Sequence, residues 1–173
     1  MRGNGNGLVN EIDLLQKKDC IESVQCSPFY LNQKCKGMGK EDIKGTVIIV
    51  EDDMVLSLVA ERIIQMLGFK VVAKAVSGEQ AIEKIKEHQP DVLLMDIFLE
   101  GSIDGIETVS RIRSFSNVPV IYISANSDKN HIDRAKKTGY IDFLSKPISQ
   151  NKMVLPMEKA IQKGGEYNIN HAS

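Results

Sequence analysis

The chain of 173 residues is 42% hydrophobic and has a net charge of −1, with both signs of charge spread along it. Its length suits one domain with an extension, and the balanced charge argues against a general binder of nucleic acids or membrane surfaces. No apolar run approaches the roughly 18 residues of a membrane-spanning helix, and the N-terminus lacks the apolar core of a signal peptide. We therefore expect a cytoplasmic protein without membrane insertion.

Residues 1–44 differ in composition from the rest of the chain, because they are rich in glycine and asparagine. We expect an N-terminal extension that is partly mobile or that contains a short helix, since Leu8, Ile12 and Leu15 have helical spacing. The cysteines are an odd set within this extension, at Cys20, Cys26 and Cys35. A disulfide framework would need an even number, and a zinc site would need paired short spacings and a fourth ligand, so free thiols are expected.

From residue 45 onward, short apolar runs alternate with amphipathic segments. Continuous apolar runs are typical of strands that are buried on both faces. The five runs are TVIIVE, KVVAKAV, DVLLMDIF, VPVIYIS and YIDFLS, at residues 46–51, 70–76, 91–98, 118–124 and 140–145.

Segments with helical spacing follow each predicted strand. In the first helix, which ends at Gly68, apolar residues recur at steps of three or four, at Val55, Leu58, Val59, Ile63 and Met66. Ser77 can cap the second helix, which Pro90 stops, and Asp104 can cap the third helix.

The last two helices are expected around 127–138, where the segment is polar and ends at Gly139, and from about Ser149 to Lys163. Pro156 falls inside the last helix and should bend it by removing a backbone hydrogen bond. Alternation of strands and helices indicates parallel strands, because parallel strands need helical crossover connections, and such connections are right-handed. The sequence thus predicts a doubly wound α/β domain at 45–163, with a five-stranded parallel sheet in the flavodoxin-like order 2-1-3-4-5, helices on both faces and a C-terminal tail at 164–173.

Polar residues stand at the carboxyl ends of four of these strands, and they are Glu51, Asp52, Asp53, Asp96, Ser124 and Lys146. Open α/β sheets bind ligands beyond the carboxyl ends of strands, where the strand order reverses. Glu51, Asp52 and Asp96 should converge there, and converging carboxylates repel unless a cation lies among them. Oxygen ligands suit Mg²⁺ or Mn²⁺. Strand geometry lets only two of the three adjacent carboxylates face the site, which leaves Asp53 the weakest candidate.

The chemistry around Asp96 suits a phosphoryl group. Lys146 supplies a positive charge, Ser124 supplies a hydroxyl, and the metal supplies a second cation. Asp96 would be the nucleophile and would form an acyl phosphate. Phosphoryl transfer then needs mainly positioning and charge neutralisation by the metal and Lys146.

The stretches IIVEDD, LLMDIFLEGSIDGIE, VIYISAN and GYIDFLSKP are similar to the receiver domain of two-component response regulators. By this resemblance, Glu51 and Asp52 are the metal-binding pair and Asp96 is the phosphoacceptor. Ser124 is then the switch hydroxyl, and Lys146 is the phosphate-sensing lysine. The resemblance further implies that the backbone carbonyl of Phe98 is a metal ligand, that Phe143 is a rotameric aromatic switch, and that the peptide bond before Pro147 is cis. For Phe143, a plain role in the core stays open.

The resemblance implies a stand-alone receiver that takes a phosphoryl group from a histidine kinase or a phosphotransfer protein and signals by conformational change. The ten residues after Lys163 are too few for a DNA-binding or enzymatic output domain, so we expect output through contact with a partner protein that the sequence does not name. A homodimer through the fourth helix, fifth strand and fifth helix would also fit the family. Phe98 and Asn126 border the approach of a hydrolytic water in the family, and here they favour slow self-dephosphorylation.

Two alternatives stay open. The domain could be a degenerate receiver-like scaffold that is not phosphorylated, or a phosphohydrolase with an aspartyl-phosphate intermediate. Haloacid-dehalogenase-type enzymes place a general-acid Asp two residues after the nucleophile, and that position is Phe98 here. A P-loop NTPase is excluded because no GxxxxGK[ST] motif occurs.

Overall fold

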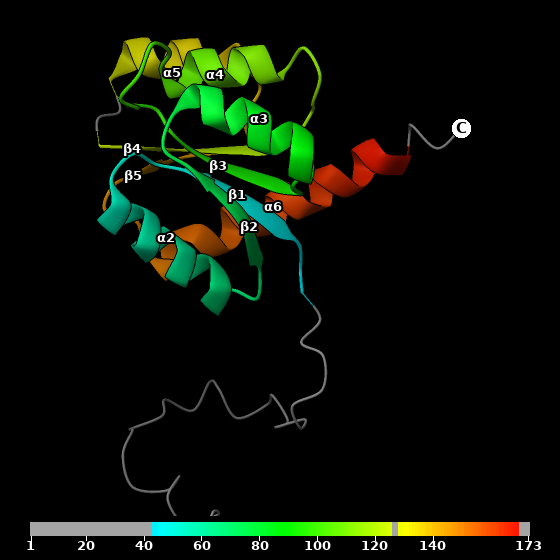
Figure 1. Ribbon diagram of the computed structural model, residues 1–173. Coiled ribbons are helices and arrows are strands. Elements are labelled where there is room, and N and C mark those ends of the chain that lie inside the picture. The colour runs from blue at the N-terminus through cyan, green and yellow to red at the C-terminus, as the bar shows by residue number, and fades with distance from the viewer. Residues whose placement is uncertain (1–42, 126–127, 170–173) are drawn as a thin grey trace, which may run out of the picture. The chain divides into compact units, whose positions relative to one another are not determined.

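Five parallel strands alternate with five helices in the part of the chain that the computed structural model describes, residues 43–125 and 128–169 (Figure 1). The strands are β1 (Thr46–Val50), β2 (Lys70–Ala75), β3 (Val92–Asp96), β4 (Val120–Ser124) and β5 (Asp142–Ser145). The helices are α2 (Met54–Met66), α3 (Gly78–His88), α4 (Gly105–Ile112), α5 (Lys129–Lys136) and α6 (Gln150–Ile169). The sheet order β2-β1-β3-β4-β5 confirms the predicted flavodoxin-like topology.

The strand register sets the carboxyl edge of the sheet. Val50 at the end of β1 pairs with Met95, so that Glu51 and Asp96 follow at the same level on neighbouring strands. Asp96 pairs with Ile123 in turn, one residue before Ser124 at the end of β4. The polar residues predicted at strand ends are therefore brought to one edge by backbone pairing alone.

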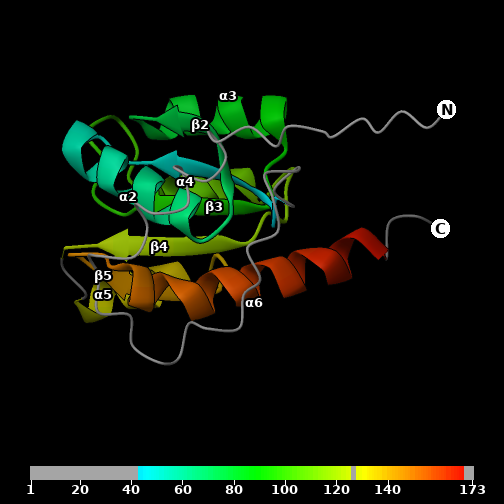
Figure 2. The ribbon, with the colours of Figure 1, turned by 90° about the horizontal axis from the view of Figure 1, so that it is seen from below.

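The sheet separates two apolar clusters, which explains why the central strands β1, β3 and β4 are apolar on both faces. On one side, α3, α4 and α5 cover the sheet, and on the other side lie α2 and α6 (Figure 1). Successive residues of β1 point to opposite clusters, with Ile48 and Val50 in the first and Val47 and Ile49 in the second. Figure 2 shows α6 alongside β4, continuing beyond the strand.

Helix starts are set by side chains that accept hydrogen bonds from backbone N–H groups. Ser77 and Asp104 cap α3 and α4, as the sequence predicts. Asp53 and Asp128 cap α2 and α5 in the same way. At the other end of α2, Gly68 has a φ of 86°, a left-handed conformation that only glycine adopts without cost.

The buried face of α2 is not the one that its large apolar residues indicate. Ile63 is the single member of the predicted series that is buried, and the other buried residues of the helix are Ser57, Ala60 and Ile64. The other members of that series are exposed, together with Met54. Small residues let the helix pack closely on the sheet, and the larger apolar side chains are left facing outward.

The last helix is longer than predicted. α6 takes in residues 164–169, which the sequence analysis assigned to the tail, and it continues on both sides of Pro156. Some predictions concern residues outside the described ranges. They are the free cysteines and the short helix of the extension, and the role of Asn126 beside the hydrolytic water. No helix in the described ranges is both long and apolar enough to cross a membrane.

Candidate phosphoacceptor and metal site

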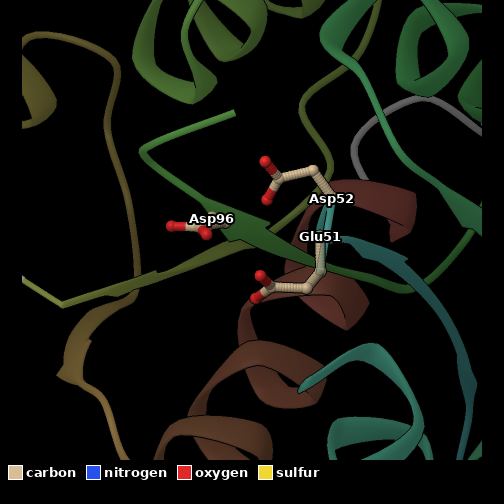
Figure 3. A group of neighbouring side chains, drawn as sticks. All are labelled: Glu51, Asp52 and Asp96. Carbon is tan, nitrogen blue, oxygen red and sulfur yellow. The ribbon is translucent and has the colours of Figure 1, made fainter. Parts of the chain in front are cut away.

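Three carboxylates meet at the carboxyl edge of the sheet. Glu51 and Asp52 follow β1, Asp96 ends β3, and one oxygen of each lies within 4.8 Å of the others. Figure 3 shows the three side chains turned to the same side from the two neighbouring strands. Glu51 is 6% and Asp96 3% exposed, so two of these charges are removed from water. Such a group is held together only by positive charge.

Lys146 supplies a positive charge from the residue after β5. Its Nζ donates hydrogen bonds to Asp96 Oδ2 at 2.6 Å and to Glu51 Oε1 at 2.9 Å. The peptide bond between Lys146 and Pro147 is cis, as predicted. One ammonium thus joins the acids of β1 and β3, and a single positive charge does not balance three carboxylates.

The pKa values of Glu51 and Lys146 depend on burial and on the charges around them. Burial raises the pKa of Glu51 to about 7, and the neighbouring Asp96 adds to the rise, against the hydrogen bond from Lys146. Burial alone would lower the pKa of Lys146, but hydrogen bonds to Asp96 and Glu51 raise it above its usual value. Lys146 therefore stays charged at neutral pH, while Glu51 is poised to accept a proton when no further cation is bound.

Asp52 and Asp53 are adjacent but have different roles. Asp53 turns away from the site and caps α2, accepting hydrogen bonds from the N–H groups of Val55 at 2.8 Å and Leu56 at 3.0 Å. Asp52 is half-buried, and its Oδ2 accepts from the N–H of Glu100 in the β3–α4 loop at 3.2 Å. The two carboxylates that face the site from β1 are therefore Glu51 and Asp52.

The side chains predicted around Asp96 lie close to it in the fold. Ser124 is fully buried at the end of β4, the strand next to β3. Phe98 donates its backbone N–H to Asp96 Oδ1 at 3.1 Å, so both carboxylate oxygens of Asp96 have donors. Phe98 is 45% exposed, and its ring meets His131 of α5 in a T-shaped contact, with 4.8 Å between ring centroids.

Phe143 lies in an aromatic cluster on the side of the sheet covered by α3, α4 and α5. Its ring centroid is 6.4 Å from those of Tyr122 and Tyr140. Tyr122 is fully buried, its hydroxyl is hydrogen-bonded to Thr138 Oγ1 at 2.9 Å, and burial raises its pKa to about 12. Phe143 is only partly buried on β5, and both the switch role and the core role stay compatible with its position.

Two residues near the site were missed by sequence reasoning. Gly105 begins α4, and a Cβ there would overlap the carbonyl oxygen of Asp96. A glycine at the first position of a helix, directly after the capping Asp104, could have indicated a close approach of backbone, because glycine is otherwise unfavourable in helices. The contact between His131 and Phe98 had no such signal, since it joins a loop to a helix 33 positions later in the chain.

Comparison with known proteins agrees with this geometry. Residues 47–158 match the family model of the response regulator receiver domain. The chemotaxis protein CheY of Bacillus subtilis is 32% identical over 116 residues, which are 66% of this chain and 96% of CheY. The transcriptional regulatory protein CitT of the same species is 33% identical over 108 residues, which are 61% of this chain and 47% of CitT. The chain spans about half the length of the transcriptional regulators it matches.

Solved structures show the same fold. The signal receiver domain of a modulated diguanylate cyclase from Desulfovibrio desulfuricans G20 has a TM-score of 0.67 at 31% identity, covering 71% of this chain and 98% of that one. A structure of CheX and CheY with BeF₃ and Mg²⁺ from Borrelia burgdorferi has a TM-score of 0.61 at 30% identity, covering 65% and 85%. With its strand order, its carboxylate cluster and this match over most of the described residues, the chain belongs to the family of response regulator receiver domains.

Proposed function

We propose that the protein is a phosphoacceptor of a two-component or phosphorelay system and that Asp96 is the acceptor. The observation that carries this is the position of the Asp96 carboxylate, which is 3% exposed, at the carboxyl edge of the sheet, and bonded to the Lys146 ammonium. An Asp96 oxygen attacks the phosphorus of a phosphohistidine, an O–P bond forms as the N–P bond breaks, and the imidazole leaves with a proton. Lys146 offsets the charge of the phosphoryl oxygens during the transfer.

The carboxylate cluster fits a divalent cation. Glu51, Asp52 and Asp96 would be its ligands, with the backbone carbonyl of Phe98 as a further oxygen, and Mg²⁺ or Mn²⁺ suits such a set. Three acids with one lysine leave net negative charge, and the pKa of Glu51 is raised first by burial and then by the neighbouring Asp96. When bound, the cation supplies charge neutralisation at the phosphoryl oxygens. The complex of the Borrelia relative with BeF₃ and Mg²⁺ supports this reading.

The phosphoryl group would be received from a histidine kinase or a phosphotransfer protein. A donor must bring its histidine to the carboxyl edge, so its surface has to meet the elements that begin there. α2 begins directly after Asp52 and Asp53, and it exposes a row of apolar side chains that are 36% to 77% exposed: Met54, Val55, Leu56, Leu58, Val59 and Met66. An apolar face of this kind next to the site suits a helical protein partner.

Signalling would follow from contacts of the phosphoryl group with Ser124. We infer that this hydroxyl is drawn toward the phosphoryl oxygens and that Phe143 turns in response, which shifts the population between two packings of the α5–β5–α6 face. Output then occurs through contact with a partner protein, or through a homodimer that uses this face. The effect on partners is a difference in affinity between the two packings.

A role as a phosphoacceptor is favoured over phosphohydrolase activity by the residue two positions after Asp96. Phe98 has no proton to donate from its side chain, so the leaving group of a substrate would lack a general acid there. Burying two acids with one lysine costs stability, because the charges lose their hydration. A chemical role for the group explains why this cost is tolerated better than a purely structural role does. We therefore place the protein among acceptors with slow self-dephosphorylation.

The test is labelling by a small-molecule donor. The protein is incubated with Mg²⁺ and phosphoramidate or acetyl phosphate, and intact mass is measured. We expect one added phosphoryl group on the wild type, lost with hydroxylamine, and none on Asp96→Asn or in excess EDTA. Labelling of Asp96→Asn at the wild-type rate would refute the assignment of Asp96, and full labelling in EDTA would refute the metal site.

A further inference from the structure

The side chain of Phe98 does not fold back onto its own loop. Its ring reaches His131 of α5, and the two rings meet edge to face with centroids 4.8 Å apart and planes inclined by 70°. The same residue donates its backbone N–H to Asp96 Oδ1. Phe98 thus connects the acceptor carboxylate at the end of β3 with the helix that follows β4, across the carboxyl edge of the sheet.

The imidazole of His131 is itself held in place. Its Nδ1 is 2.8 Å from Asp128 Oδ2, and because a carboxylate only accepts, Nδ1 carries the donated hydrogen. The backbone N–H of His131 donates to Asp128 Oδ1 at 3.0 Å, which caps α5. Hydrogen bonds to the carboxylate, the backbone N–H of His131 first, hold the pKa of Asp128 below its usual value. The His131 side chain is only 22% exposed, so its ring offers Phe98 a fixed surface.

A second tie joins the same two regions one helical turn further on. Arg134 Nη2 donates to Asp104 Oδ2 at 2.7 Å, and Asp104 is the cap of α4. Positions 131 and 134 are neighbours on one face of α5. Arg134 therefore anchors α5 through Asp104, whereas His131 contacts Phe98, so variants of the two residues distinguish anchoring of the helix from placement of the ring.

From these contacts we propose that His131 is a positioning residue for the lifetime of the phosphorylated state: it holds the Phe98 ring on the α5 side of the carboxyl edge, where the ring would cover the approach of water to Asp96. This rests on the proposed function. Hydrolysis of the acyl phosphate needs a water whose oxygen attacks phosphorus opposite the Asp96 oxygen: an O–P bond forms, the bond to Asp96 breaks, and the water loses its proton. An apolar ring on that approach holds no water. Without His131, the ring of the half-exposed Phe98 is free to move away from the approach of the water.

The experiment compares the decay of phosphorylated variants. Protein labelled with phosphoramidate and Mg²⁺ is freed of donor, and the loss of the phosphoryl mass is followed. An edge-to-face pair fixes a ring by a factor of about two to ten, so His131→Ala should decay about two- to tenfold faster than the wild type. His131→Phe keeps a ring at this position and should restore the slow decay. Arg134→Ala, which loosens α5 elsewhere, should decay like the wild type.

Two further measurements separate positioning from a merely structural role. In the unphosphorylated protein, the NMR signals of the Phe98 ring, assigned with Phe98→Leu, should shift in His131→Ala and stay near their wild-type positions in Arg134→Ala. In the Phe98→Ala background, adding His131→Ala should change the decay no further.

Each other outcome has one meaning. The inference is overturned if His131→Ala decays like the wild type or if the Phe98 signals do not move. It is also overturned if the effects in the double variant are additive, or if the lifetime in Arg134→Ala is as short as in His131→Ala. All four outcomes leave Asp96 as the acceptor. If the wild type gains no phosphoryl mass at all, the proposed function fails, and this inference fails with it.

Discussion

The same substitution at the adjacent acids Asp52 and Asp53 should affect different properties: stabilisation by Mg²⁺ at Asp52, and the stability of the fold itself at Asp53. Asp53 accepts hydrogen bonds from two N–H groups at the start of α2, whereas Asp52 faces Glu51 and Asp96. Capping needs an acceptor oxygen, and asparagine supplies one as well as aspartate does. A divalent cation at this site would be held mainly by carboxylate oxygens, and asparagine replaces an anionic ligand with a neutral carbonyl oxygen, which binds the cation more weakly. Replacement of each residue by asparagine and by alanine therefore distinguishes the two roles.

The magnitudes follow from these contacts. Asp53→Ala leaves two N–H groups without their acceptor and should lower the free energy of unfolding by about 1–2 kcal/mol, with or without Mg²⁺. For a domain of this size, that is a fall in Tm of about 3–8 °C. Asp53→Asn should stay within a few tenths of a kcal/mol of the wild type. Mg²⁺ at about ten times its Kd should stabilise the wild type and both Asp53 variants by about 1.4 kcal/mol.

The assay is urea unfolding followed by circular dichroism, in EDTA and in Mg²⁺. Asp52→Asn should unfold near the wild-type midpoint in EDTA, because it removes one of three crowded negative charges, but it should lose most of the stabilisation by Mg²⁺. The division of roles is refuted if Asp53→Asn loses as much stability as Asp53→Ala, or if Asp52→Asn keeps the full Mg²⁺ response.

Three other predictions concern the acceptor loop and the switch. Ser124→Ala should still be labelled on Asp96 but should show smaller amide shifts in α5 and β5 on labelling, and shifts of wild-type size would contradict the switch role. Gly105→Ala should destabilise the fold by about 1–3 kcal/mol or more, since its Cβ overlaps the Asp96 carbonyl oxygen, and a wild-type urea midpoint would refute this. Phe98→Asn, which can hold a water, should shorten the phosphorylated lifetime several-fold, and unchanged decay would show that this side chain does not control the water.

The strands and the convergence of the three acids were predictable because each depends on a local pattern. Strands buried on both faces read as unbroken apolar runs, and their carboxyl ends are where the first polar residue occurs, as at Glu51 and Asp96. Parallel pairing then brings those ends to one edge, whatever the loops do. Short polar caps such as Ser77 and Asp104 gave the helix starts for the same reason, since the signal lies in one residue next to the helix.

Features that depend on packing between distant segments could not be read from the sequence. The spacing of Val55, Leu58 and Val59 shows that α2 is a helix, but not which of its two apolar stripes faces the sheet. The close approach at Ser57 and Ala60 decides that, and small residues carry little signal. The contact of Phe98 with His131 likewise depends on the course of the β3–α4 loop, for which local propensity gives no direction.

The sparse core contribution of α5 has a consequence for local stability. Among the described residues of this helix, Ala135 is the one that is buried, whereas α4 buries five of its eight. The exposed ion pair between Arg134 and Asp104 adds only about 0.2–1 kcal/mol. Opening α5 should thus cost far less than global unfolding, and its amide hydrogens should exchange with solvent well before those of α4. A helix held by so few buried contacts is the one that the proposed phosphoryl contacts would move at the lowest cost in packing.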